Sequence, residues 1–327
     1  MEKRIIGLDI GYGFTKITDG ENTAIFPSVA GDVVQADFDN DLVTAGAGHV
    51  IETGRRRFFY GEHAQKHSRN PLALFARERT EQADVLLVLF YAALAELGHQ
   101  GKMALCTGLP VDWFGDRDNL ERALIGEHRF TVDGEPWHVK VCQIAIVPQP
   151  FGAFFDQALD DAGNVLNAAF VRGKVGILDV GTFTTDLALS DGLEYIAKGS
   201  GSRTVAMSTV WRQVRDGIKE RYGIEYDLHQ IDHIVRNGRA VTVQGHDHDV
   251  GDLVAAAVEN LADQVIALAR DRWGRALDFK RLIVTGGGAY YLANQVQAVY
   301  PHAVATHTPD LGNLRGFRKY AARKFAR

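Results

Sequence analysis

The sequence predicts an α/β protein built from two similar domains. Residues 176–189 read Gly-Ile-Leu-Asp-Val-Gly-Thr-Phe-Thr-Thr-Asp-Leu-Ala-Leu, which is typical of a buried strand, a tight turn and a returning strand. Residues 5–17, Ile-Ile-Gly-Leu-Asp-Ile-Gly-Tyr-Gly-Phe-Thr-Lys-Ile, share its core, about half of the 327-residue chain earlier. Two half-chains that open with the same hairpin indicate two similar domains that face one ligand.

The first half of the chain alternates strand patterns with helix patterns. After the first hairpin, a polar section runs to about residue 56 and predicts short edge strands and loops. The following elements are expected in order: a helix over 79–97, a strand over 103–109, a loop and helix over 111–123, a hairpin of 130–132 with 137–146, and a helix from Phe151 to Leu159.

The second half repeats this alternation after the hairpin at 176–189. The expected elements are a third strand at 195–197, a helix over 203–222, short mixed elements over 227–250, a helix over 251–272, a strand over 280–285, a helix near 290–298, a short strand at 303–305 and a basic helix over 312–325. Gly286, Gly287 and Gly288 lie where the strand over 280–285 ends and the next helix begins.

Composition and charge restrict the class of protein. The chain is 46% hydrophobic and 24% charged, as is typical of globular proteins, and its length suggests about two domains. A net charge of −5 argues against a generally basic surface, so no direct nucleic-acid contact is expected. The N-terminus does not resemble a signal peptide, and the longest apolar run, 85–95, is too short to span a bilayer. We therefore expect a soluble, cytoplasmic protein with no membrane partner.

Cys106 and Cys142 read as buried free thiols of a reducing compartment.

The unusual residue of each hairpin is the aspartate that ends its first strand. A carboxylate there is costly unless something pairs with it. After Asp179, the turn at 181–185 offers glycine backbone amides and threonine hydroxyls. Such a turn suits phosphate oxygens, and the carboxylate suits a hydrated divalent cation. An ordinary hairpin whose aspartate caps the turn is the alternative, and the near copy around Asp9 favours the ligand site.

Three glycine-rich stretches, at 7–17, 176–189 and 283–288, occur in the order of the signatures of the actin-like ATPase superfamily, which the chain resembles over nearly its whole length. That superfamily includes actin, heat-shock chaperone ATPases and sugar kinases. Within it the chain is similar to prokaryotic actin-like proteins of the ParM/StbA plasmid-segregation type. The residues behind this similarity are Gly-Tyr-Gly after Asp9, Phe-Pro-Ser at 26–28, Phe-Tyr-Gly-Glu-x-Ala at 59–64, Thr-Gly-Leu-Pro at 107–110 and Asp-Leu-Gly-Asn-Leu-Arg-Gly at 310–316.

The resemblance implies an actin-like fold with a nucleotide cleft between its two domains. Each domain would hold a five-stranded mixed sheet flanked by helices. Residues 1–165 would form the first domain and 166–309 the second, with a C-terminal helix at 310–327 that packs back on the first domain.

The resemblance also implies roles for particular residues. Asp9 and Asp179 would face each other across the cleft and hold Mg²⁺ through its waters, because two carboxylates aimed at one point repel each other without a cation. Backbone amides of the two turns would bind the β- and γ-phosphates, and the residues are Gly11, Tyr12, Gly13, Phe14, Gly181, Thr182 and Phe183. Lys16 either adds positive charge toward the phosphates or points outward from its strand.

Gln149 occupies the position at which the superfamily orients the attacking water. A glutamine has no useful basicity, so its role would be orientation; the alternative is a helix-start glutamine that bonds a local amide. Asp186 resembles a supporting carboxylate. Gly286, Gly287 and Gly288 would let a purine and ribose lie flat on the backbone. Gly201-Ser202-Arg203, at an expected helix start, is a second candidate phosphate or ribose contact.

Three further patterns have simpler interpretations. His246-Asp247-His248-Asp249 reads as a polar loop, with a metal site as the alternative. Arg55-Arg56-Arg57 reads as a solvated face, with a nucleic-acid contact as the alternative. The basic residues of the last helix, Arg315, Arg318, Lys319, Arg323, Lys324 and Arg327, would balance a helix C-terminus or meet an acidic partner subunit.

The function implied is an ATPase that uses Mg²⁺, with ATP or GTP as nucleotide, and polymerises into filaments. Its partners would be further copies of itself and a DNA-binding adaptor protein, for plasmid segregation or intracellular positioning. The alternative is a small-molecule kinase of the same fold, which needs a general base for a substrate hydroxyl. Asp112 is the candidate for that base.

Overall fold

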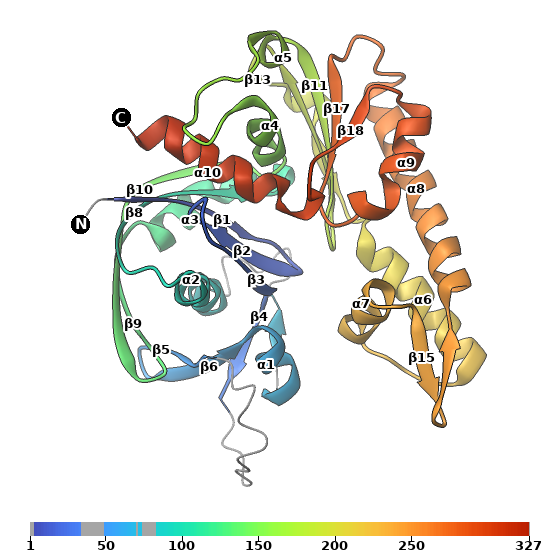
Figure 1. Cartoon of the computed structure of the whole chain (residues 1–327), viewed down its shortest axis with the longest axis horizontal. Coiled ribbons are helices and arrows are strands. Elements are labelled where there is room, and N and C mark those ends of the chain that lie inside the picture. The colour runs from blue at the N-terminus through green and yellow to red at the C-terminus, as the bar shows by residue number, and fades with distance from the viewer. Residues whose placement is uncertain (1–2, 34–48, 70, 74–82, 327) are drawn as a thin grey trace. The chain divides into compact units, whose positions relative to one another are not determined.

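The computed structural model describes residues 3–33, 49–69, 71–73 and 83–326 (Figure 1). Its contacts divide the chain into two compact units. Unit 1 comprises residues 1–168 and 311–327, and unit 2 comprises residues 169–310. The expected division, after residues 165 and 309, falls close to both of these limits. Each unit combines a mixed sheet with flanking helices, which confirms the α/β prediction.

Unit 1 is organised around one sheet of ten strands in the order β3-β2-β1-β8-β10-β9-β5-β6-β4-β7. Its strands are β1 (Arg4–Ile10), β2 (Phe14–Thr18), β3 (Thr23–Pro27), β4 (Val29–Asp32), β5 (Ile51–Thr53), β6 (Arg56–Tyr60), β7 (Leu72–Ala73), β8 (Gly101–Leu109), β9 (Gly126–Val132) and β10 (Glu135–Pro148). The centre is parallel, because β8 pairs with β1 on one side and with β10 on the other. The β2 strand returns antiparallel beside β1.

Helices cover both faces of this sheet. They are α1 (Gly61–His67), α2 (Ala83–Leu97), α3 (Arg117–Leu124), α4 (Phe151–Ala158) and α10 (Gly312–Phe325), with a 3-10 helix η2 (Val111–Asp116). Residues 79–82 of the expected helix 79–97 lie outside the described residues, as does 34–48 of the expected polar section.

The central strand β8 contributes to two separate cores. Met103 and Leu105 belong to the core that contains α2, whereas Ala104 and Cys106 belong to the core that contains Phe317 of α10. Successive side chains of a strand point to opposite faces, so one apolar strand serves both. An α-helix with apolar residues all round is typically buried, and α2 follows this rule.

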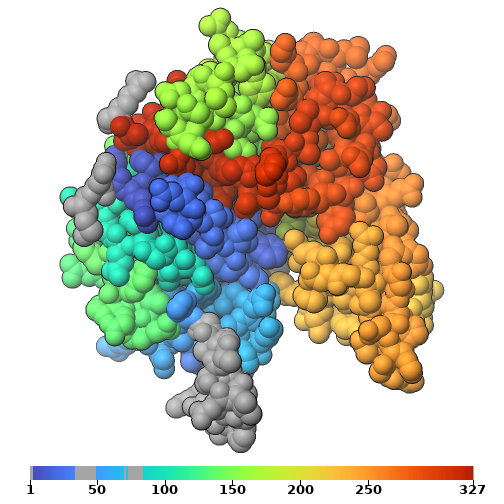
Figure 2. Space-filling view, in the orientation of Figure 1, coloured from blue at the N-terminus to red at the C-terminus, as the bar shows by residue number. Residues whose placement is uncertain are grey.

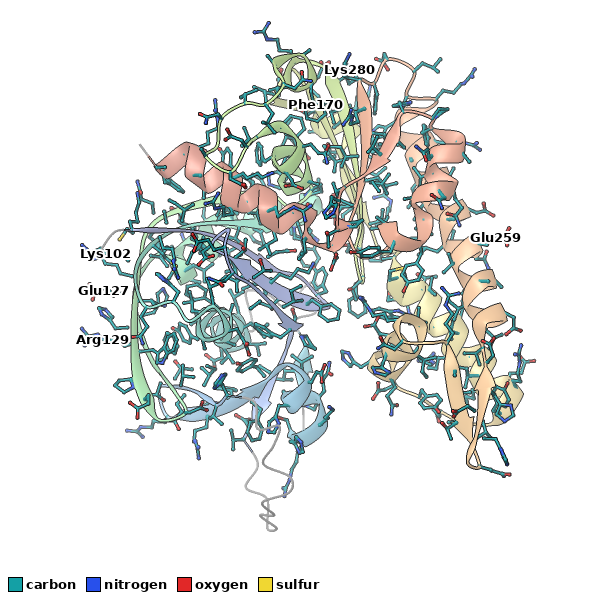
Figure 3. All side chains as sticks on the ribbon, in the orientation of Figure 1. Lys102, Glu127, Arg129, Phe170, Glu259 and Lys280 are labelled. Atoms are coloured by element: carbon teal, nitrogen blue, oxygen red, sulfur yellow. The ribbon has the colours of Figure 1, made fainter. Side chains whose placement is uncertain are left out.

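Strand β9, which lies between β10 and β5, has alternating buried and exposed side chains. Glu127 and Arg129 point away from the unit 1 ribbon (Figure 3), whereas His128 and Phe130 are buried. The Phe130 ring stacks on that of Tyr91 from α2, with centroids 4.2 Å apart. This alternation fixes which face of the strand meets the core.

The C-terminal helix α10 packs tightly on α4 and on β1 of the same unit (Figures 1 and 2). The two helices cross at glycines: a Cβ placed on Gly316 would lie 1.7 Å from the carbonyl oxygen of Gly152. Beside this crossing, Asp156 accepts hydrogen bonds from Arg315 at 2.7 Å and from Lys319 at 2.9 Å. The sequence predicted that Arg315 and Lys319 would balance a helix C-terminus or meet a partner subunit. In the structure, both residues instead bind Asp156 of α4 and so hold α10 against its own unit.

Unit 2 contains a six-stranded sheet. The order is β13-β12-β11-β17-β18, with β14 also paired to β12. Its strands are β11 (Lys174–Val180), β12 (Thr185–Asp191), β13 (Glu194–Tyr195), β14 (Gly201–Arg203), β17 (Arg281–Thr285) and β18 (Ala303–Ala305), and a separate hairpin joins β15 (Ala240–Val243) to β16 (His246–Asp249). The helices are α6 (Met207–Tyr222), α7 (Leu228–Arg236), α8 (Gly251–Trp273) and α9 (Ala289–Val299), and α5 (Ala168–Arg172) lies at the division.

The sequence predicted five strands in the sheet of each domain, but the two sheets have ten and six strands. Five strands of each sheet nevertheless share one arrangement. The path β3-β2-β1-β8-β10 of unit 1 has the same neighbours and strand directions as β13-β12-β11-β17-β18 of unit 2. Unit 1 adds strands because the long strand β10 also pairs with β9, and β9 pairs with β5. Unit 2 adds only β14.

Two local expectations changed in the structure. Cys106 is buried, and its burial raises the pKa of the thiol. Cys142 is only partly buried, because the pairing of β10 with β8 skips from Val141 to Gln143 and leaves Cys142 at a bulge. The third strand of the meander is shorter than expected, and residues 197–199 form a 3-10 turn.

In the described part of the chain, no helix combines the length and the apolar character needed to cross a membrane.

Candidate functional site

The first candidate group lies at the end of β1 in unit 1. Asp9 is only 4% exposed, although its side chain is a carboxyl group. Directly after it, the chain turns, and the amide of Gly11 donates to the carbonyl of Phe14 at 3.0 Å. This tight turn sets Asp9 opposite Lys16 on β2, and the Lys16 Nζ lies 3.6 Å from the Asp9 Oδ2.

Lys16 therefore does not point outward, which was one of the two alternatives. Its side chain is 14% exposed and pairs with the buried carboxylate. Residues directly opposite each other on paired strands lie on the same face of the sheet. The hairpin register alone could have predicted this contact.

Gln149 meets the same carboxylate from the far end of β10. Its Nε2 donates to the Asp9 Oδ1 at 3.0 Å. Its main-chain N–H donates to the Leu109 carbonyl at 2.7 Å, and its own carbonyl accepts from Gly152 in the first turn of α4. Side chain and backbone are thus both held, and the local-amide alternative does not describe the side chain. Asp9, Lys16 and Gln149 are joined by one ion pair and one hydrogen bond, and this group is here called the Asp9 cluster.

The turn residues of the first hairpin differ in what they present. The Gly13 carbonyl accepts from the amide of Ser28, the residue between β3 and β4, at 2.9 Å. The Tyr12 side chain is 8% exposed, and its ring meets the edge of Trp113 with centroids 6.3 Å apart. The Tyr12 ring is therefore part of the interior of unit 1, so the backbone is the part of this turn suited to bind an anion.

Unit 2 repeats the hairpin at the corresponding place. Asp179 is 5% exposed, and the Gly181 amide donates to the Thr184 carbonyl at 2.9 Å. Asp179 lies opposite Asp186, which is 3% exposed and accepts from the Thr184 hydroxyl at 3.0 Å. Unit 1 thus has a carboxylate–lysine pair across the hairpin, whereas unit 2 has two carboxylates. The two hairpins therefore place different chemical groups beside the equivalent aspartate.

The turn after Asp179 also supports the start of α6. The amides of Met207 and Ser208 donate to the carbonyls of Gly181 and Thr182 at 3.2 and 2.8 Å. The positions of Gly181, Thr182 and the neighbouring Phe183 are therefore set by helix α6 as well as by the hairpin. A turn held on two sides is a preorganised place for backbone donors.

The three glycines after β17 have unequal roles. Gly286 adopts a φ of +82°, and a Cβ on it would lie 2.4 Å from the Asp179 Oδ1. A Cβ on Gly288 would lie 2.4 Å from the Val180 Cγ1. A Cβ on Gly287 would meet only the Arg236 Nη2, at 3.9 Å. Gly286 and Gly288 thus allow the turn to press against β11, while Gly287 leaves open backbone.

Arg236 is a site residue that the sequence did not single out. It extends from α7 toward Gly287, and its Nε donates to the Asp232 Oδ1 at 2.7 Å. Burial raises the pKa of Asp232, and the Arg236 charge acts in the opposite direction. An Asp-x-x-x-Arg pair at helical spacing is visible in the sequence. Its nearness to the glycines depends on how α7 folds back.

Two other expected features were wrong. Residues 201–203 are not at a helix start, because they form β14 against β12, and α6 begins only at Met207. The helix-start argument for a phosphate contact at Gly201-Ser202-Arg203 is therefore removed. Residues 246–249 are not a loop but strand β16 of a hairpin, and no metal-binding cluster occurs among the described residues.

Comparison with known proteins matches both halves of the chain. A family model described as "Actin like proteins N terminal domain" matches residues 7–152, and one described as "Archaeal actin homologue MreB-like, C-terminal" matches residues 177–298. An archaeal actin homolog of Thermoplasma volcanium is 24% identical over 341 aligned residues, covering 98% of this chain and 99% of that protein.

Solved structures share the fold. The crystal structure of an archaeal actin homolog in complex with ADP superposes with a TM-score of 0.81 at 20% identity, covering 97% of this chain and 99% of that one. A 15-stranded ParM filament from Clostridium botulinum has a TM-score of 0.80 at 21% identity, covering 98% and 99%. These likenesses show that the two-unit architecture is the actin-like fold.

Proposed function

We propose that this chain, whose two halves match family models of actin-like proteins, is an actin-like ATPase that binds and hydrolyses ATP with Mg²⁺ and assembles into filaments. One observation carries the proposal: each unit buries an aspartate at the end of its first sheet strand, directly before a tight glycine turn. A buried carboxylate needs a charged or hydrogen-bonding partner, and the same setting in both units favours one shared kind of ligand. Backbone amides beside a carboxylate suit a magnesium-bound polyphosphate.

The donor sets of both units fit such a ligand. Asp9 and Asp179 would hold Mg²⁺ through water, and the ion would supply neutralisation of phosphate charge. The backbone amides of residues 11–14 and 181–183 would bind phosphate oxygens. Lys16 would act on the phosphates through Asp9, because it is already paired with that carboxylate.

Gln149 would orient the attacking water. Its amide nitrogen donates to Asp9, so its amide oxygen is the atom suited to accept from that water. In unit 2, the open backbone at Gly287 would receive the purine and ribose, with Gly286 and Gly288 shaping the turn. The nucleotide would be ATP, with GTP as the competing substrate to be tested.

Relatives support the assembly part of the proposal. One relative of this fold was solved as a filament and another with ADP. The partner would accordingly be a second copy of this chain. We also propose that the filament positions DNA, such as a plasmid, through a separate adaptor protein, since a net charge of −5 does not favour direct DNA contact.

Sedimentation and light scattering with Mg-ATP test the proposal. Wild-type protein should pellet with Mg-ATP and release phosphate, and chelation of Mg²⁺ should stop both. Asp179→Asn should lower phosphate release by about 10²-fold or more, because it removes the buried charge without changing shape. Asp191→Asn, at the exposed end of β12, is the matched control and should behave as wild type.

One combination of results would overturn the proposal. A protein that stays monomeric at every concentration with Mg-ATP or Mg-GTP, and that phosphorylates a sugar, is a kinase of this fold. In that case Asp112, exposed on η2, is the residue to substitute next.

A further inference from the structure

Unit 1 contains a cavity that the proposed nucleotide chemistry does not use. Its volume is about 350 Å³, within the range of small-molecule sites. It lies between the ends of β1 and β8, helix α2, η2 and α3. Most of its wall is apolar, and the apolar side chains are Ile10, Leu86, Leu109, Trp113, Leu120 and Ala123.

The cavity shares its walls with the Asp9 cluster. Ile10 directly follows Asp9 on β1, and the Leu109 carbonyl accepts the main-chain N–H of Gln149 at 2.7 Å. Gly108, also in the wall, lies so close that a Cβ on it would be 2.9 Å from the Gln149 Cα. A molecule in this cavity would therefore touch Ile10, the sequence neighbour of Asp9, and Leu109, the hydrogen-bond partner of the Gln149 main chain. Asp9 and Gln149 are the residues proposed to act on magnesium and water.

Trp113 links the cavity to the first hairpin turn. Its indole forms one wall, and the edge of the same ring system meets Tyr12. An indole wall favours an aromatic ligand, because offset or edge-to-face ring contacts add to the burial of apolar area. Thr107, 2% exposed, is a buried polar residue in the lining that can orient such a ligand by a hydrogen bond.

The cavity lining includes two exposed charged residues, Arg122 and Asp116, which therefore lie at its rim. Arg122 contacts the neutral amide oxygen of Asn119, and within the described ranges no carboxylate forms an ion pair with it. Arg56, by contrast, pairs with two carboxylates. A guanidinium at the rim favours an anionic group, whereas Asp116 at the same rim disfavours a doubly charged one such as phosphate.

We propose that this cavity is an effector site for a small aromatic monoanion, whose binding slows turnover by displacing the backbone beside Asp9 and Gln149. The binding part stands on the cavity alone. The coupling part rests on the proposed function, because it requires nucleotide turnover at the Asp9 cluster.

Two fluorescent probes test binding on the full-length protein. Anilinonaphthalene sulfonate (ANS) has the aromatic body and one negative charge, and N-phenylnaphthylamine (NPN) has the same body without the charge. Ala123→Phe fills the cavity from α3 and should weaken both probes by at least about tenfold. Arg122→Ala should weaken ANS about fivefold and leave NPN unchanged, as expected for a partly exposed charge contact of about 1 kcal/mol.

Controls separate the cavity from other apolar surface. Leu277, 78% exposed in unit 2, offers apolar surface outside the cavity, and Leu277→Ser should leave the binding of both probes unchanged. Because Arg122 is exposed, its substitution tests the proposal even if the filled cavity prevents folding. Equal binding of both probes to wild type, Ala123→Phe and Arg122→Ala would overturn the proposal.

Turnover measurements then test the coupling. Saturating ANS should slow phosphate release by wild type about threefold or more, since small displacements near reacting groups are costly, and should leave Ala123→Phe unaffected. If ANS binds but turnover is unchanged, the effector role is wrong. If wild type binds ANS yet hydrolyses no nucleotide, the proposed function and the coupling both fail, and the binding result remains.

Discussion

Replacement of Gly286 by alanine should destabilise unit 2 and disturb Asp179 together. Gly286 has a φ of +82°, and left-handed backbone costs a residue with a Cβ about 1–2 kcal/mol. The new Cβ would lie 2.4 Å from both the Asp179 Oδ1 and the Val180 carbonyl oxygen, about 1 Å short of the 3.4 Å of ordinary contact. Such overpacking adds about 1–3 kcal/mol.

The sum is about 2–5 kcal/mol, which can be read as a shift in melting temperature. Unit 2, residues 169–310, has about 140 residues, and domains of this size shift by roughly 3 °C per kcal/mol. Calorimetry of the nucleotide-free Gly286→Ala protein should therefore show the unit 2 transition lowered by about 6–15 °C. Phosphate release should fall as well, because the clash falls on the proposed magnesium carboxylate.

The adjacent glycine provides a matched control. A Cβ on Gly287 meets only the Arg236 guanidinium at an ordinary 3.9 Å, so Gly287→Ala should melt within about 2 °C of wild type. Its methyl group would nevertheless occupy the surface proposed for the purine, so nucleotide affinity should fall about tenfold. If both variants melt alike, the distinct backbone roles assigned to these glycines are wrong. If Gly287→Ala binds nucleotide normally, the purine does not lie there.

Three further predictions concern unit 1. Gly316→Ala should cost at least about 3 kcal/mol in urea unfolding, because its Cβ would lie 1.7 Å from the Gly152 carbonyl; Gly115→Ala, with no atom within 4 Å of its Cβ, should be neutral, and similar midpoints for both would contradict this. Asp156→Asn should cost about 2–3 kcal/mol by leaving its two basic partners on α10 without a charge; unchanged unfolding would show that they are satisfied by solvent. Burial lowers the pKa of His99, so the folded state binds its proton less readily than the unfolded state, and stability should fall as pH drops from about 7 to about 5. His99→Gln should flatten that part of the curve of melting temperature against pH, and an unchanged slope would assign it to other groups.

Much of the fold could be predicted from the sequence because it depends on local patterns. The two hairpins combine an apolar run, a glycine turn and a second apolar run, and these short-range features specify strand, turn and strand. Helix α8, expected at 251–272, was found at Gly251–Trp273 because its apolar residues repeat at helical spacing along its whole length. The strands β5, β6, β4 and β7 were not placed, since strands of two to five residues are determined by the strands they pair with and not by their own periodicity.

The candidate site was predictable in part for the same reason. Asp9 and Asp179 could be recognised from a few residues of sequence, because a carboxylate at the end of an apolar strand is unusual. Lys16 was visible only through hairpin register. The Arg203 segment was misjudged because Gly-Ser-Gly-Ser suits either a helix start or an edge strand, and pairing with β12 decided between them.

The sequence by itself determined the two repeated hairpins, their buried aspartates and the glycines that follow β17, because each depends on residues close along the chain. Only the tertiary structure decided that Gln149 donates to Asp9 across 140 residues of sequence, that Gly286 presses on Asp179, and that β1, β8, α2, η2 and α3 enclose a cavity. Contacts between distant segments depend on how whole elements pack, and no periodicity within one segment encodes them.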